Sequence, residues 1–141
     1  MAKILITGGA GFVGYHLCSV LSEDSSNDIV VLDNLQRGRL DEDLTQLIGR
    51  ANVSFVQGDL TDVELFRTLN RDFEYIYHLA AVIGVQNVMD NPDRVLYVNA
   101  ISTFNVLEYA KGLNKLKKLL FSSTSEVYAG TLKHYGLDVP T

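Results

Sequence analysis

Hydrophobic residues along the chain gather in short runs that alternate with longer stretches of mixed polarity. Five of these runs are apolar at consecutive positions and rich in Ile, Val, Leu, Phe and Tyr. This pattern is typical of strands that are buried on both faces of a parallel sheet. It predicts strands over Lys3–Thr7, Asp28–Leu32, Val53–Gln57, Glu74–His78 and Lys117–Phe121.

The stretches between these strands carry apolar residues at three- and four-residue spacing, as one face of a helix requires. Two of them also have start signals. Thr61 and Glu64 fit a capping box, and Asn91 offers a capping side chain directly before Pro92. Helices are therefore predicted over Phe12–Leu21, Glu42–Ile48, Asp62–Leu69 and Pro92–Lys111.

The regular alternation of strand and helix predicts the α/β class, with a doubly wound parallel sheet. The first predicted strand runs into a glycine-rich turn, Thr7-Gly-Gly-Ala-Gly-Phe-Val-Gly14, and a helix follows at once. In such a loop Gly8 permits a tight turn, Gly11 lets the backbone approach a pyrophosphate, and Gly14 lets the helix pack closely on the strand. The helix N-terminus adds N–H donors and a partial positive charge. No Gly-Lys-Ser/Thr follows, which excludes a Walker-type loop.

Asp33 comes at the end of the second predicted strand, nineteen residues after Gly14. A dinucleotide-binding fold places there the acid that binds the adenosine ribose hydroxyls. A carboxylate at this position repels a 2′-phosphate, so NAD is favoured over NADP, although Arg37 and Arg39 follow closely. Considered alone, Asp33 would better be explained as an ordinary loop aspartate, but the strand end, the spacing and the glycine loop together favour the ribose role.

Small or polar residues follow every predicted strand, at the edge where a parallel sheet binds its ligands. Asp59 could accept a hydrogen bond from an adenine amino group, or it could merely help to start the next helix. Ala80 and Ala81 are small enough to let a ribose or nicotinamide ring lie against the backbone. His78 is expected to be a core or supporting histidine rather than a catalytic base.

Composition narrows the class further. Of 141 residues, 47% are hydrophobic and 21% are charged, which is typical of a soluble globular chain, and the net charge of −5 argues against a nucleic-acid-binding protein. Cys18 is the single cysteine and is expected to be a buried core residue. We expect a cytoplasmic protein, because the sequence shows neither a transmembrane-length apolar stretch nor a signal peptide. No metal site is predicted.

Taken in order, six motifs resemble those of the extended short-chain dehydrogenase/reductases. They are Thr7–Gly14, Asp33–Leu35, Gly58–Leu60, His78–Ala81, Asn99 and Ser122–Tyr128. Within that family the chain looks like the NAD-dependent nucleotide-sugar epimerases and dehydratases. The resemblance implies a Rossmann-type sheet, NAD as cofactor, a nucleotide-sugar substrate and a possible homodimer.

The resemblance also implies a role for individual residues of this chain. The diphosphate would be bound by Gly8, Gly11, Phe12 and Val13, the ribose by Asp33 and Asn34, and the adenine by Asp59 and Leu60. The nicotinamide side would be lined by Leu79, Ala80 and Ala81, with Asn99 and Ser122 supporting that end of the cofactor.

Two residues near the fifth predicted strand are candidates for catalysis. Thr124 matches the family's catalytic Ser/Thr, whose hydroxyl orients the sugar O–H that is oxidised. A strand-end hydroxyl that caps the backbone is the alternative. Glu126 is similar to a Glu that serves as base or substrate contact in dehydratases and decarboxylases, although it could also be an exposed turn residue.

The family's catalytic Tyr, followed four residues later by Lys, has no counterpart among the seven tyrosines of the chain. The resemblance would place this pair beyond Thr141. We therefore expect residues 1–141 to be an NAD-binding Rossmann domain that is incomplete at its C-terminus, with five strands present and the last strands and the substrate domain absent. The parent enzyme would transfer a hydride from the sugar to NAD and form a keto-sugar intermediate. The alternative is an NAD-binding module without catalysis.

Overall fold

The computed structural model describes residues 2–124, and its five strands form one parallel sheet. The strands lie in the order β3-β2-β1-β4-β5, so that β1 is central. Their bounds are β1 (Lys3–Thr7), β2 (Asp28–Asp33), β3 (Val53–Gln57), β4 (Tyr75–His78) and β5 (Lys118–Phe121). All five predicted strands are confirmed; β2 is one residue longer than predicted, and β4 and β5 each begin one residue later.

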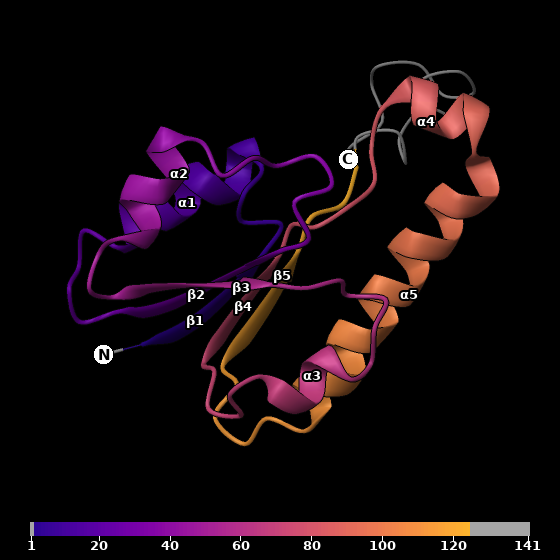
Figure 1. Cartoon of the computed structure of the whole chain (residues 1–141). Helices are drawn as coiled ribbons and strands as arrows, with labels where there is room; N and C mark the ends of the chain where they lie inside the picture. The colour runs from indigo at the N-terminus through magenta and orange to yellow at the C-terminus, as the bar shows by residue number, and fades with distance from the viewer. Residues whose placement is uncertain (1, 125–141) are drawn as a thin grey trace, which may run out of the picture.

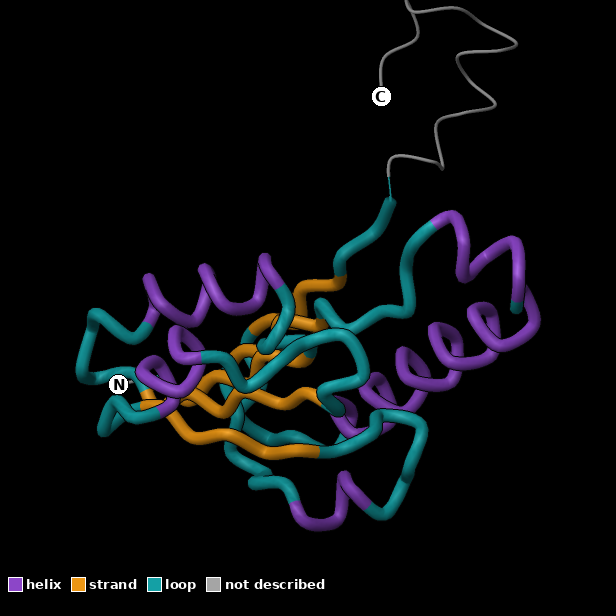
Figure 2. Tube along the Cα trace, turned by 45° about the horizontal axis from the view of Figure 1, so that its top comes forward, coloured by secondary structure: helices purple, strands orange, loops and turns teal. Residues whose placement is uncertain are grey.

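Helices cover both faces of this sheet (Figures 1 and 2). On one face lie α1 (Phe12–Leu21) and α2 (Glu42–Ile48), and on the other lie α3 (Leu65–Thr68) and α5 (Pro92–Lys111). A short helix, α4 (Val85–Asp90), precedes α5. This arrangement confirms the doubly wound, Rossmann-type α/β fold.

Neighbouring positions along the central strands contribute to two separate cores. Ile6 packs with Cys18 on the side of α1 and α2. Leu5 packs with Phe66 and Val106 on the side of α3 and α5. Because both faces of these strands are buried, consecutive positions must be apolar, which is the pattern seen in the sequence. The predicted burial of Cys18 is confirmed.

The predicted start of α3 is wrong. The helix covers Leu65–Thr68 rather than Asp62–Leu69, and the expected capping box does not form. Thr61 instead gives both its N–H and its hydroxyl to Asp59 Oδ1, at 2.9 and 2.8 Å. The Glu64 N–H bonds to the side chain of the residue two positions earlier, at 2.9 Å. These local bonds compete with helical hydrogen bonds, so the helix begins later in the chain, at Leu65.

Two further differences lie around the start of α5. Pro92 stands in the first turn as predicted, but the Asn91 side chain makes no capping bond within the part of the chain that the structure describes. α4 was not predicted from the sequence. It follows Gly84, whose φ is +109°, and it contains no buried residue. Val85, Val88 and Met89 are spaced as on one helix face, but all three are exposed and the helix is only six residues long, too short for a clear period.

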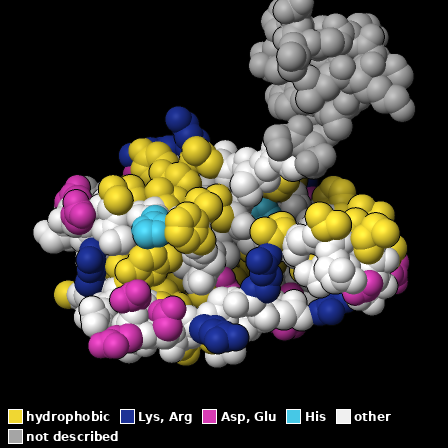
Figure 3. Space-filling model, turned by 90° about the horizontal axis from the view of Figure 1, so that it is seen from above, with side chains coloured by type: hydrophobic (Ala, Val, Ile, Leu, Met, Phe, Trp, Pro, Cys, Tyr) yellow, Lys and Arg dark blue, Asp and Glu magenta, His cyan; other side chains and the backbone are white. Residues whose placement is uncertain are grey.

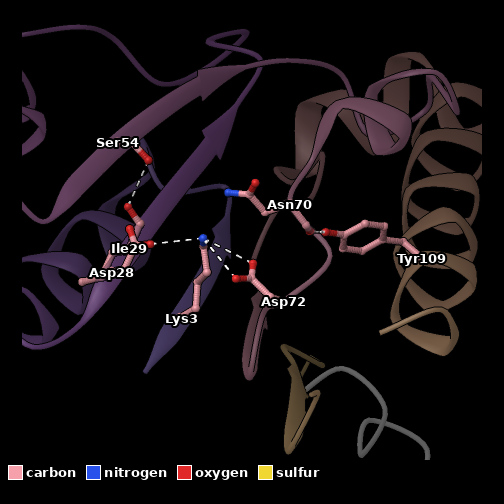
Figure 4. A network of polar contacts seen from close by, with 7 residues as sticks. All are labelled: Lys3, Asp28, Ile29, Ser54, Asn70, Asp72 and Tyr109. Atoms are coloured by element: carbon pink, nitrogen blue, oxygen red, sulfur yellow. Dashed lines mark hydrogen bonds and ion pairs between the residues drawn. The ribbon is translucent and has the colours of Figure 1, made fainter. Parts of the chain in front are cut away.

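Polar contacts join the elements at the edge of the sheet where the strands begin (Figure 4). Lys3 Nζ lies 3.3 Å from a carboxylate oxygen of Asp28 and 3.3 Å from one of Asp72. The Tyr109 hydroxyl on α5 donates to the Asn70 carbonyl. These contacts tie together the amino-terminal edge of the sheet, opposite the edge to which the sequence assigns the ligand.

Candidate functional site

A cleft of about 670 Å³ opens at the carboxyl edge of the sheet. The loops after β1, β2, β3 and β4 line it together with one face of α5. Figure 3 looks down on this end of the molecule, which is hollowed between the α1 side at the left and the α4–α5 side at the right. Its volume lies within the range of small-molecule sites. All the predicted cofactor-binding residues except Asn99 and Ser122 line it, namely Gly8, Gly11, Phe12, Val13, Asp33, Asn34, Asp59, Leu60, Leu79, Ala80 and Ala81.

Three glycines of the loop after β1 are required by close backbone packing. Gly8 has φ +72°, and a Cβ there would lie 2.6 Å from the Ala80 nitrogen. A Cβ at Gly14 would lie 2.4 Å from the Gly8 oxygen, so this glycine packs α1 against the loop, and the predicted packing against the strand is wrong. The glycine that packs against a strand is Gly9, where a Cβ would lie 2.4 Å from Val31 Cγ1.

α1 begins at this loop and points its first backbone N–H groups toward the cleft. Its N-cap is Gly11, and no side chain among the described residues caps it; its first turn holds no acidic residue. α2, by contrast, is capped by Asp41, which accepts from the Leu44 N–H at 2.9 Å. Phe12 and Val13 line the cleft and are 81% and 62% exposed. An uncapped helix N-terminus of this kind attracts anions.

Asp33 ties together the two loops beside the cleft. One of its carboxylate oxygens accepts from the Ala10 N–H at 3.1 Å, and the other accepts from the Leu35 N–H at 2.8 Å. Leu35 has φ +58° and turns the chain back toward the glycine loop. Gly38 then packs against that loop, since a Cβ there would lie 2.5 Å from Ala10 Cβ. Each carboxylate oxygen can accept a second bond, so Asp33 can also bind hydroxyls in the cleft.

Asn34 and Asp59 meet on the β2–β3 side of the cleft, with Asn34 Nδ2 3.5 Å from Asp59 Oδ2. The backbone hydrogen bond from Thr61 lowers the pKa of Asp59, and its carboxylate is therefore charged at neutral pH. The carbonyl of Leu60 accepts from Asn105 Nδ2 on α5 at 2.9 Å. Asp59 shapes the loop after β3, but it does not start the helix.

Asn99 and Ser122 bond to the protein backbone and are not among the residues that line the cleft. The Asn99 side chain accepts from the Val82 N–H at 2.7 Å and donates to the Val82 carbonyl at 2.9 Å. The Ser122 N–H and hydroxyl approach the His78 carbonyl at 3.2 and 3.3 Å. These two residues position the segments that follow β4 and β5.

His78 is buried between β1 and α5. Its Nδ1 lies 2.8 Å from Thr7 Oγ1, and its Nε2 lies 3.3 Å from Thr103 Oγ1. Burial lowers the pKa of His78 to about 4, so the ring is neutral at pH 7. The Thr103 hydroxyl donates its one proton to the Asn99 carbonyl at 2.8 Å, which assigns the ring hydrogen to Nε2. The prediction of a core histidine is confirmed.

The two predicted catalytic residues lie near the end of the described chain. Thr124 is exposed, three residues after the end of β5. Glu126 lies outside the described residues. Their catalytic roles stay predictions.

Three arginines at the cleft are not among the predicted cofactor-binding residues, although the sequence analysis weighs Arg37 and Arg39 against the preference for NAD. Arg37, Arg39 and Arg94 all line the cleft. Arg37 Nη1 lies 3.5 Å from the Ile83 carbonyl oxygen, across the cleft. The charge of Arg94 on α5 contributes to the lowered pKa of Asp59. No sequence pattern points to Arg94, because this residue reaches the cleft only through the packing of α5.

Residues 2–124 contain neither a metal-binding cluster nor a membrane-spanning helix. Within that range, no three His, Cys, Asp or Glu side chains cluster in a way that could hold a metal ion. No helix within the same range has the length and apolar character needed to cross a bilayer.

Comparison with known proteins identifies the family. The model of the NAD dependent epimerase/dehydratase family matches residues 4–136. The chain belongs to this family. The resemblance inferred from the six motifs is confirmed, and the family's cofactor is the NAD that the sequence predicts.

Two curated relatives show the range of activities in the family. UDP-glucuronate 4-epimerase 4 of Arabidopsis thaliana is 35% identical over 135 residues, which cover 89% of this chain and 30% of the relative. UDP-glucuronic acid decarboxylase 1 of Danio rerio is 39% identical over 132 residues, which cover 94% of this chain and 29% of the relative. The chain thus spans about a third of the length of these relatives.

Solved structures confirm the fold. The UDP-N-acetylglucosamine 4-epimerase from Methanobrevibacter ruminantium M1, in complex with UDP-N-acetylmuramic acid, superposes with a TM-score of 0.83 at 30% identity, over 99% of this chain and 42% of that one. The Bordetella bronchiseptica enzyme WbmF, in complex with NAD+, superposes with a TM-score of 0.78 at 28% identity, over 89% and 37%.

Proposed function

We propose that this chain binds NAD in the cleft and forms the cofactor-holding part of an enzyme that modifies a nucleotide sugar. One observation carries the proposal. The loop glycines, the uncapped start of α1, Asp33 and Asp59 come from three separate βα connections, and all of them line one cleft. Family membership and the complex of WbmF with NAD+ support the same cofactor.

Residues along the cleft fit the successive parts of a dinucleotide. The loop at Gly11 and the first turn of α1 offer backbone donors to a diphosphate. Asp33 would accept from the ribose hydroxyls, and Asp59 from the adenine amino group. Leu79, Ala80 and Ala81 present small or apolar groups to the nicotinamide side.

The chemistry that we propose begins with oxidation of the sugar, for which NAD, when bound, supplies the hydride acceptor. The Thr124 hydroxyl would orient the sugar O–H, and Glu126 would act as base or substrate contact. The relatives include an epimerase and a decarboxylase, and the family is described as epimerase/dehydratase, so the class that we propose is epimerase, dehydratase or decarboxylase. The cytoplasmic location and the homodimer stay predictions.

Calorimetric titration of the 141-residue chain with NAD tests the proposal. We expect saturable binding, and we expect Asp33→Ala to weaken it by about 1–3 kcal/mol, the usual range for losing a charged hydrogen-bond partner. Because Asp33 also holds Ala10 and Leu35, the unfolding free energy of the variant is measured in parallel. Absence of binding at millimolar NAD would overturn the proposal, and an unchanged affinity in the variant would overturn the ribose assignment.

The second candidate function is an NAD-binding module without catalysis. It differs from the first candidate in whether the protein has a Tyr followed four residues later by Lys, a pair that residues 1–141 do not contain. Sequencing the gene beyond codon 141 separates the two candidates. A Tyr-x-x-x-Lys in the continuing reading frame supports the enzyme, and a stop codon at that point supports the module.

A further inference from the structure

Arg37 extends across the mouth of the cleft. It lies in the loop after β2, and its Nη1 is 3.5 Å from the carbonyl oxygen of Ile83, in the loop after β4. Both residues line the cleft. β1, whose end carries the glycine loop, lies between β2 and β4 in the sheet. The side chain therefore joins the two loops that flank the glycine loop.

The backbone around Arg37 is held in this place by specific contacts. Asn34 Oδ1 accepts from the Gln36 N–H at 3.0 Å, directly after the turn that Asp33 makes with Leu35. Gly38, the next residue after Arg37, packs against Ala10 of the glycine loop. The guanidinium is thus carried on a segment that contacts the loop assigned to the diphosphate.

The contact between Arg37 and Ile83 is weak and replaceable. A separation of 3.5 Å is at the long end for an N–H···O bond. The same carbonyl accepts a shorter bond of 2.8 Å from Asn87 Nδ2, so it keeps a partner when the guanidinium leaves. Arg37 is exposed, so little packing is lost if it moves.

We propose that Arg37 is a further cofactor-binding residue, which gives its guanidinium to the diphosphate of NAD. The proposal rests on the proposed function. A guanidinium bonds more strongly to anionic phosphate oxygens than to a neutral carbonyl, and its planar fork matches a phosphate group. Together with the first turn of α1, it would place positive charge on two sides of the diphosphate.

Arg37 could instead bind a different anion, the 2′-phosphate of NADP. That phosphate belongs to the adenosine ribose, which we assign to Asp33. The carboxylate of Asp33 would repel it, whereas it does not oppose binding of the diphosphate of NAD. We therefore assign Arg37 to the diphosphate, and the ligand series below distinguishes the two.

The test measures dissociation constants for NAD, ADP, adenosine and NADP with the wild-type chain, Arg37→Ala, Arg37→Gln and Arg37→Lys. We expect Arg37→Ala and Arg37→Gln to weaken NAD and ADP about tenfold and to leave adenosine unchanged. Arg37→Lys should retain most of the affinity, because it keeps the charge. Raising the salt concentration should weaken NAD binding more in the wild type than in Arg37→Ala.

The Gln variant separates cofactor binding from a structural role, since its amide can still donate to the Ile83 carbonyl. Arg67→Ala is the charge-matched control, because Arg67 lies on α3 and pairs with Glu64 at the surface. Unchanged affinity for NAD in Arg37→Gln would overturn the assignment, as would a loss confined to NADP or an equal loss in Arg67→Ala. If the wild type binds neither NAD nor ADP, the proposed function fails and this inference fails with it. If the wild type binds NAD and Arg37→Ala binds it equally well, only the inference fails.

Discussion

The side chain of Asn99 holds the backbone of Val82 by two hydrogen bonds, of 2.7 Å to its N–H and 2.9 Å to its carbonyl. α5 thereby fixes the segment after β4 that lines the side of the cleft assigned to the nicotinamide. We expect Asn99→Leu, which keeps the branched shape of the side chain but removes its polar atoms, to lower the free energy of unfolding by about 1–3 kcal/mol, because two backbone groups lose their partner. Urea denaturation measures this loss.

The matched control for this prediction is Asn87→Ala. Asn87 bonds to a single backbone carbonyl and is exposed on α4, so its removal should cost less than about 1 kcal/mol. Equal losses of unfolding free energy in the two variants would show that the two bonds from Asn99 to Val82 stabilise the fold no more than the single bond of Asn87.

His78 makes the stability of the fold dependent on pH. Burial lowers its pKa to about 4 in the folded chain, against 6.5 for an ordinary histidine. The unfolded chain therefore binds a proton between these values while the folded chain does not. Its stabilising contribution is complete above about pH 6.5 and is lost as the pH falls toward 4. Between pH 7.5 and pH 5.5 we expect a loss of about 1.4 kcal/mol.

Urea denaturation of the wild type and of His78→Gln at these two pH values checks the prediction. The Gln side chain can still donate and accept hydrogen bonds, but it does not titrate. The variant should be less stable at pH 7.5 and should lose less stability on acidification. The same pH dependence in both proteins would assign the effect to other groups.

Alanine substitutions at Gly14 and Gly11 should have different effects, the first on the stability of the fold and the second on the binding of NAD. A Cβ at Gly14 would lie 2.4 Å from a backbone oxygen, whereas the closest heavy atom to a Cβ at Gly11 is at 3.2 Å. We expect Gly14→Ala to lower the free energy of unfolding by about 2 kcal/mol. Gly11→Ala should change it by less than about 1 kcal/mol and should weaken NAD binding about tenfold, because the methyl group takes space that the diphosphate needs.

Thermal denaturation and calorimetric titration of the two variants give both quantities. Gly9→Ala serves as a second fold variant, since a Cβ there would lie 2.4 Å from Val31 Cγ1. If Gly11→Ala binds NAD as tightly as the wild type, the diphosphate does not approach the backbone at this residue.

Cys18 should report on the opening of α1. Burial raises the pKa of its thiol to about 11, and the side chain is fully buried. A thiol reagent should therefore leave the folded chain unmodified and should react with the single cysteine in denaturant. Rapid reaction without denaturant would show that α1 separates from the sheet while the rest stays folded.

The sequence predicted the strands well, because burial on both faces of a parallel sheet requires apolar residues in succession. It failed at α3, where Asp59 draws the Thr61 N–H and hydroxyl into the loop, and at α4, which buries no residue. These two helices are only four and six residues long, too short to show a clear hydrophobic period. Their positions depend on local polar bonds and on loop geometry.

The residues of the cleft likewise differ in how far the sequence predicts them. Gly8 and Asp33 could be placed from spacing along the chain, because both belong to one βαβ unit. Arg37 could not be assigned to the diphosphate from the sequence, since the residue that it contacts lies 46 positions away. The support that Thr7 and Thr103 give to His78 joins a strand to a distant helix and likewise has no local signature.

Asp33 combines two tasks that a protein engineer would want to change separately. Its carboxylate accepts from Ala10 in the glycine loop and from Leu35 in the next turn, at the position assigned to the ribose. A basic or apolar replacement, made to admit NADP, would also remove the acceptors that hold these two loops. Conversion of the cofactor preference therefore requires a second substitution that restores an acceptor. A single exchange at Asp33 would lower the stability of the fold as well as change the selectivity for the cofactor.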